Sequence, residues 1–267
     1  MELRQFLAYL NKGHEEPGGR FGNPQLTHPV RPRTVKDYHS HLRTFFRWLV
    51  EEGGIEECPI DGIAPPISRS DQVQPFSEAQ VAAMIAAARK TVHARRDEAL
   101  IMFLLDTGVR ASELADLTLA SVDLTGKRAI VLGKGNKRRT VYFGRATTKA
   151  LWQYLNEEVR EPNSPLFLSD RGRQAGDPLT RSGLLQLIGR VGSAASIEAV
   201  RCSPHTFRHT FAVNFLRNGG NCFTLQQLLG HTNSQMTYKY VALAQADIEK
   251  QHRQYSPVDC MPSVKRR

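Results

Sequence analysis

The sequence feature that most restricts the fold is a single glycine-rich turn, Gly133-Lys134-Gly135-Asn136, in a chain whose other patterned segments have helical spacing. Strand-like runs flank the turn at Arg128–Leu132 and Arg139–Phe143, which predicts a hairpin. The expected fold class is therefore mainly α with a small antiparallel β-sheet (α+β). Helices are predicted at about 77–90, 95–107, 146–159, 181–190, 204–217, 224–229, 234–241 and 244–253.

A polar, proline-containing stretch at 64–72 divides the chain. Before it, helical patterns cover only about 2–11 and 33–52, and two helices are too few to bury a robust core. We therefore expect a short helical domain over 1–66 and a linker over 67–75. A larger domain over 76–258 and a tail over 259–267 follow.

The charge is divided just as unevenly. Residues 1–66 carry 8 Lys/Arg and 9 Asp/Glu, whereas 67–267 carry 28 and 17, a net charge of +11. A polyanionic partner is expected, because Lys and Arg that neutralise phosphates release counterions. From Lys127 to Arg145 there are seven basic residues and no acidic one. A merely solvated basic hairpin is the alternative, and charge alone does not separate a DNA enzyme from a DNA-binding module or a ribosomal partner.

Other classes are disfavoured. No stretch approaches the 18 or so apolar residues of a membrane span, and the N-terminus lacks a secretory signal pattern. The four cysteines are far apart and form no CxxC pair, which argues against a disulfide framework and a zinc knuckle. We expect a cytoplasmic protein with no membrane partner.

Arg110 lies at a helix junction within TGVRASEL (107–114). One helix ends at Gly108 and another begins near Ala111, so the guanidinium can leave the surface toward a ligand. Glu113 shares the helical face of Arg110 and can hold that guanidinium in place. An ordinary Arg–Glu helix pair is the alternative.

A second helix start carries two histidines and an arginine. Ser203 is a suitable N-cap and Pro204 fits the first helical position. His205 and Arg208 then share a face of the first turns, where free N–H groups and the helix dipole favour a phosphate. A core histidine with a solvated Arg208 is the alternative. His205 and His209 have metal-pair spacing, but no HExxH glutamate accompanies them, so no metal is predicted.

The last candidate residues lie near the C-terminal end. Gly230 is a fitting helix terminator and leaves His231 just past the end of an apolar helix, where a lone histidine is more often structural. Tyr238 and Tyr240 are two residues apart and point in different directions, so at most one faces a site.

Taken in order, an arginine, a lysine, His-x-x-Arg, a histidine and a tyrosine resemble the tyrosine recombinases, the phage-integrase and Xer-type family. The resemblance spans about 35–255 and rests on TGVRASEL, GKGNKRRTV (133–141), SPHTFRHTFA (203–212) and LGHTNSQMTYKYV (229–241). The nine-residue gap from His231 to Tyr240 is the family's usual one and selects Tyr240 over Tyr238 as nucleophile.

The resemblance implies a site-specific DNA recombinase that uses no cofactor and no metal, in integration, excision or resolution. Tyr240 would attack a phosphodiester to leave a 3′-phosphotyrosyl intermediate, which stores the bond energy. Arg110 and Arg208, supported by Glu113, would neutralise the nonbridging oxygens.

The remaining roles are also implied by the resemblance. His205 would assist proton transfer at the tyrosine, and His231 would donate to a nonbridging oxygen. Lys134 would protonate the departing 5′-oxygen.

The family pattern further implies a C-shaped clamp on a double-stranded DNA site, made of a core-binding domain and a catalytic domain. Residues 1–66 would be a shortened core-binding domain, because the family has more helices there than the two predicted. The active form would be a homo-oligomer on DNA, a tetramer in the synaptic complex, and nucleoid-associated.

The helix at 244–253 would dock onto a neighbouring subunit or pack in cis. Candidate DNA-backbone contacts are Lys137, Arg138, Arg139 and Arg181.

Two alternatives from the same motifs remain open. One is a catalytically silent, sequence-specific DNA-binding protein, which the reactive residue types at all six positions disfavour. The other is a type IB topoisomerase-like relaxing enzyme, which shares the constellation. A metal-dependent nuclease would need clustered carboxylates, and the acidic residues are dispersed.

Overall fold

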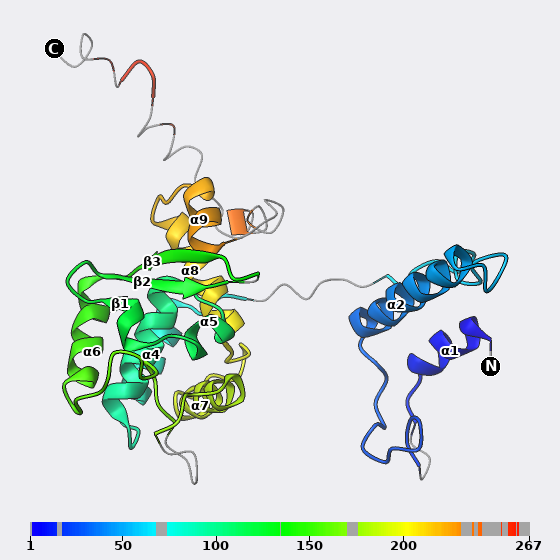
Figure 1. Ribbon diagram of the computed structural model, residues 1–267, viewed down its shortest axis with the longest axis horizontal. Helices are drawn as coiled ribbons and strands as arrows, with labels where there is room; N and C mark the ends of the chain where they lie inside the picture. The colour runs from blue at the N-terminus through cyan, green and yellow to red at the C-terminus, as the bar shows by residue number, and fades with distance from the viewer. Residues whose placement is uncertain are drawn as a thin grey trace. The chain divides into compact units, whose positions relative to one another are not determined.

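The computed structural model describes residues 2–14, 18–67, 74–133, 135–169, 176–230, 237, 240–241, 252, 256–259 and 261. The chain divides into two compact units, Met1–Gln72 and Val73–Arg267, and each is described by itself (Figure 1). The division falls within the stretch 67–75. No helix in the described part is long and apolar enough to cross a bilayer.

The first unit contains helices α1 (Leu3–Leu10) and α2 (Pro32–Glu51). Helix α2 has the predicted apolar periodicity, but Phe45 and Trp48 are 50% and 51% exposed, so much of its aromatic surface is uncovered. So small a unit buries little apolar surface. Among the described residues, its core cluster consists of three buried side chains: Leu7, Leu10 and Val35.

The described residues of the second unit are mainly helical, as predicted, with one small sheet. The strands pair antiparallel in the order β1-β2-β3, with Val131 opposite Arg139. The two-residue strand β1 and the short helix η1 are too short to leave a periodic pattern, and the sequence did not predict them. The elements are α3 (Glu78–Ala88), α4 (Ala94–Thr107), α5 (Ala111–Ala115), η1 (Leu119–Ser121), β1 (Val122–Asp123), β2 (Arg128–Leu132), β3 (Arg138–Tyr142), α6 (Arg145–Leu155), α7 (Arg181–Ala194), α8 (Pro204–Arg217) and α9 (Cys222–Leu229).

Capping residues fix where several helices begin. The Ser77 hydroxyl accepts from Gln80 N (3.2 Å) and Gln80 Oε1 accepts from Ser77 N (2.9 Å), which confirms the predicted capping box of α3. Ser203 caps α8 by accepting from Thr206 N (3.3 Å), directly before Pro204. The predicted helices at 234–241 and 244–253 lie almost entirely outside the described residues.

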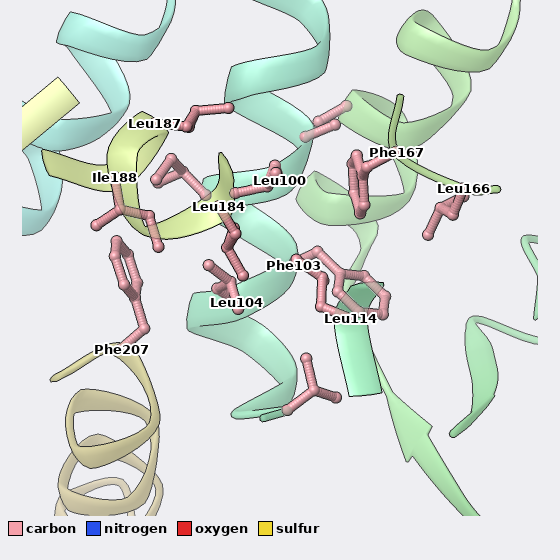
Figure 2. Close-up of a cluster of buried hydrophobic side chains, with 14 of the residues drawn as sticks. Leu100, Phe103, Leu104, Leu114, Leu166, Phe167, Leu184, Leu187, Ile188 and Phe207 are labelled. Carbon is pink, nitrogen blue, oxygen red and sulfur yellow. The ribbon is translucent and has the colours of Figure 1, made fainter. Parts of the chain in front are cut away.

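The main core surrounds α4, against which α3, α6 and α8 pack (Figure 1). Figure 2 shows Leu100 and Leu104 of α4 on the side of α7 and α8, whereas Phe103 points toward Leu114 and Phe167, and all three α4 side chains are fully buried. Burial of apolar side chains on this scale is the dominant stabilising contribution to such a unit. Since α4 ends at Thr107, this packing fixes the position of the α4–α5 junction.

A second, smaller cluster joins α8 and α9, and α9 also contacts β3. Its buried members are Ala212, Val213, Leu216, Leu225, Leu229 and Tyr240. Helix α9 is therefore held beside α8 and strand β3.

Candidate active site

Arg110 lies where α4 ends and α5 begins. Gly108 closes α4 in the left-handed conformation (φ 59°), and a Cβ at this position would lie 2.5 Å from the Phe211 ring, so the turn requires glycine. The Arg110 backbone N–H donates to Glu113 Oε2 (2.7 Å) and its Nη1 donates to Oε1 (2.8 Å). The Arg110 side chain is 36% exposed, so part of its guanidinium faces solvent.

Arg208 is buried in the second turn of α8, with 4% exposure. Its Nη1 donates to the Gly108 carbonyl (2.8 Å) and its Nη2 to the Leu229 carbonyl (2.6 Å). These carbonyls lie at the C-terminal ends of α4 and α9, where the helix dipole stabilises a cation. Burial and the nearby Arg110 charge lower the pKa of Arg208 to about 10, which leaves it charged at neutral pH. The alternative of a solvated Arg208 is wrong.

Tyr240 is 5% exposed and packs in the cluster between α8 and α9. Burial raises the pKa of its hydroxyl, while the charges of Arg208 and Arg110 act in the opposite direction. The tyrosine therefore lies within the electrostatic field of both arginines, although 130 residues of sequence separate it from Arg110.

Two histidines of α8 line the same region. The His209 ring lies 5.1 Å from the Tyr240 ring and 6.5 Å from the His205 ring, centroid to centroid. Partial burial lowers the pKa of both histidines, and the Arg208 charge adds to that effect. Sequence reasoning considered His209 only as half of a metal pair. Its spacing of four from His205 already placed both on one helical face.

The end of α9 brings three arginines together through its backbone. Arg139 Nε donates to the Leu228 carbonyl (2.8 Å), Arg208 Nη2 to the Leu229 carbonyl and Arg110 Nη2 to the Gly230 carbonyl (3.4 Å). The last carbonyls of a helix have no partner within the helix, so these guanidiniums satisfy them. Gly230 ends α9 in the left-handed conformation (φ 63°), as the sequence predicted.

The other predicted contacts divide into two groups. Lys137, Arg138 and Arg181 are exposed, and Arg181 is the first residue of α7. A residue that contacts the DNA backbone would lie on the surface. The Arg139 side chain does not, because it is only 13% exposed and binds Glu113. Lys134 and His231 lie outside the described residues.

Comparison with known proteins identifies the family of this chain. Residues 74–247 match the model of the phage integrase family. Tyrosine recombinase XerD of Listeria innocua is 30% identical over 233 residues, which cover 85% of this chain and 77% of that protein. Tyrosine recombinase XerC of Bacillus subtilis is also 30% identical, over 84% of this chain and 75% of that protein.

Solved structures share the fold. The crystal structure of XerA recombinase superimposes with a TM-score of 0.59 and 26% identity, and the match covers 95% of this chain and 88% of that one. XerH site-specific recombinase bound to palindromic difH substrate gives a TM-score of 0.70 over 94% of this chain and 71% of that one. At 19% identity, that second match shows the fold alone.

The helical fold, the arginine-rich site and these matches define the class of this protein, a DNA strand-exchange enzyme. The chain belongs to the phage integrase family, the tyrosine recombinases.

Proposed function

We propose that this chain carries out site-specific DNA recombination, with Tyr240 as the nucleophile that forms a 3′-phosphotyrosyl bond. The observation that carries the proposal is that Tyr240 lies in the electrostatic field of Arg110 and Arg208 at the end of α9. A phosphodiester placed there would meet two fixed cations, which is the arrangement that stabilises charge developing on the nonbridging oxygens. The named relatives favour this activity over a silent DNA-binding protein or a relaxing enzyme.

The proposed roles follow from the chemistry of each side chain. His205 accepts the tyrosine proton, since a neutral imidazole is the form that its lowered pKa favours. Lys134 protonates the departing 5′-oxygen and His231 donates to a nonbridging oxygen, both by family resemblance. Arg110 and Arg208 supply the positive charge that a metal pair would otherwise supply, so we propose a reaction without a metal ion.

DNA is the partner, and the basic residues of the second unit support this. We propose that Lys137, Arg138 and Arg181, which are exposed, contact the DNA backbone. We also propose that the working form is a homo-oligomer on DNA, a tetramer at synapsis, in which residues 1–66 act as a shortened core-binding domain.

Covalent capture tests the proposed function. The chain is incubated with a library of nicked duplexes in EDTA, denatured, and the DNA that stays attached to protein is sequenced. We expect adducts on a restricted set of sequences, each with a free 5′-hydroxyl beyond the cleavage point. A strict requirement for Mg²⁺, or cleavage without any covalent adduct, would instead indicate a nuclease.

A pH profile tests the role of His205. Burial and the charges of Arg208, Arg110 and Arg201 lower its pKa below 6.5, so the imidazole stays neutral further into the acid range. The rate at subsaturating DNA reports groups of the free enzyme, so its acid limb should lie below pH 6.5. His205→Gln should remove that limb. A limb above pH 6.5 that persists in this variant would assign it to another group.

A further inference from the structure

Arg139 points toward the interior, whereas its neighbour Arg138 points toward solvent. Successive side chains of a strand lie on opposite faces, and on β3 the face shared with Val141 is the buried one. Arg139 is opposite Val131 of β2, which is 1% exposed, so its side chain leaves the sheet toward α5 and α9. A basic hairpin in a DNA-binding protein thus directs one of its arginines away from the solvent.

The Arg139 guanidinium binds two elements at once. Nη1 and Nη2 donate to Glu113 Oε1 (2.5 Å) and Oε2 (2.8 Å), a bidentate pair, and Nε donates to the Leu228 carbonyl (2.8 Å). The Arg139 side chain also lies close to the backbone of Gly230: a Cβ at that position would be 3.1 Å from Arg139 Cδ. These bonds cross 26 and 89 residues of sequence and join β3 to α5 and to the end of α9.

Glu113 needs this partner. Its side chain is 1% exposed and its Oε1 accepts from both Arg110 and Arg139. Burial alone would raise the pKa of Glu113, but hydrogen bonds and charge from Arg139 and Arg110 lower it overall. Among the described residues, the loss of Arg139 would leave the carboxylate with Arg110 as its ion-pair partner in a nearly water-free position, which is costly. The orientation of Arg110 depends on that carboxylate.

We propose that Arg139 is a positioning residue of the active site. It holds Glu113 and the end of α9 together, and thereby fixes the Arg110 guanidinium beside the Gly230 carbonyl. The inference rests on the proposed function for its catalytic consequence. It replaces the expectation that Arg139 contacts the DNA backbone.

The test separates binding from cleavage in Arg139→Met and Arg139→Lys. At saturating DNA, we expect Arg139→Met to form the covalent adduct about 10- to 100-fold more slowly, because small displacements of charged groups have effects of this size. Its DNA affinity and salt dependence should match those of the unmodified chain. Arg139→Lys should recover part of the rate, since it keeps the charge but lacks the planar fork.

Two further variants serve as references. Arg138→Met, on the exposed face of the same strand, should weaken DNA binding and lower the slope of log K against log salt by about one. Arg95→Met, which removes a 58% exposed arginine of α4, should behave like the unmodified chain in both assays. If Arg139→Met loses affinity and salt slope as Arg138→Met does, or cleaves at the unmodified rate, the proposal is overturned.

Melting temperatures give a readout that does not depend on cleavage. If Arg139 acts through Glu113, Arg139→Met should lower the melting temperature less in a Glu113→Gln background than in the unmodified chain. Additive losses would overturn the coupling, and Arg139→Lys serves in the same cycle if Arg139→Met does not fold. Failure of the unmodified chain to form any adduct would instead overturn the proposed function, while this cycle would still decide the coupling.

Discussion

Tyr240→Phe is expected to abolish the covalent protein–DNA adduct on a nicked duplex, a loss of more than about 10³-fold. Phenylalanine removes the only atom of this side chain that can attack phosphorus. The aromatic ring still fills the apolar cluster between α8 and α9, so the fold and sequence-specific DNA binding should persist. Adduct formation is measured on denaturing gels, and affinity by a mobility-shift assay on the same duplex.

Tyr238→Phe is the matched control, because it makes the same chemical change two residues away. It should form adducts at the unmodified rate. Adducts that survive in Tyr240→Phe and disappear in Tyr238→Phe would move the nucleophile to Tyr238.

Arg208→Lys should slow adduct formation at saturating DNA by about 10²- to 10³-fold, equivalent to about 3–4 kcal/mol of transition-state stabilisation. Lysine keeps the positive charge but has no planar fork, so it cannot bind the Gly108 and Leu229 carbonyls and a phosphate with fixed geometry. DNA affinity should change much less than the rate, because Arg208 is buried. Single-turnover kinetics and a binding titration on the same duplex separate the two effects.

Arg217→Lys makes the same replacement at an exposed position at the end of α8 and should cleave as the unmodified chain does. A thermal melt of both variants detects any loss of folding caused by the unpaired carbonyls. Cleavage by a folded Arg208→Lys within about threefold of the unmodified rate would show that charge alone suffices.

Local sequence signals predicted the helices accurately where a capping residue marks the first turn. Ser77 with Gln80, and Ser203 with Pro204, fix helix starts through bonds that span three residues, so the sequence contains the whole interaction. Strand β3 was predicted one residue late, because a short strand beside a turn has no comparable marker. The same local rules placed Arg110 at its junction, where Gly108 ends α4.

The positions of the charged side chains were harder to predict. Arg138 and Arg139 are adjacent and chemically identical, and both were predicted from the sequence to contact the DNA backbone. The alternation of β3, together with the burial of Val141, would have placed Arg139 on the inner face. That Glu113 and the end of α9 occupy that face is not encoded near either residue.

The sequence by itself determined the order of the reactive residues, the helix ends that present them and the class of chemistry that they imply. Only the tertiary structure decided which arginines are buried, that α9 offers successive carbonyls to three of them, and that Tyr240 packs within their field. The physical reason is separation along the chain. Caps and turns are closed by neighbours a few residues apart, whereas the arginine–carbonyl hydrogen bonds join residues 21 to 120 positions apart and form only when α4, α8, α9 and β3 pack together.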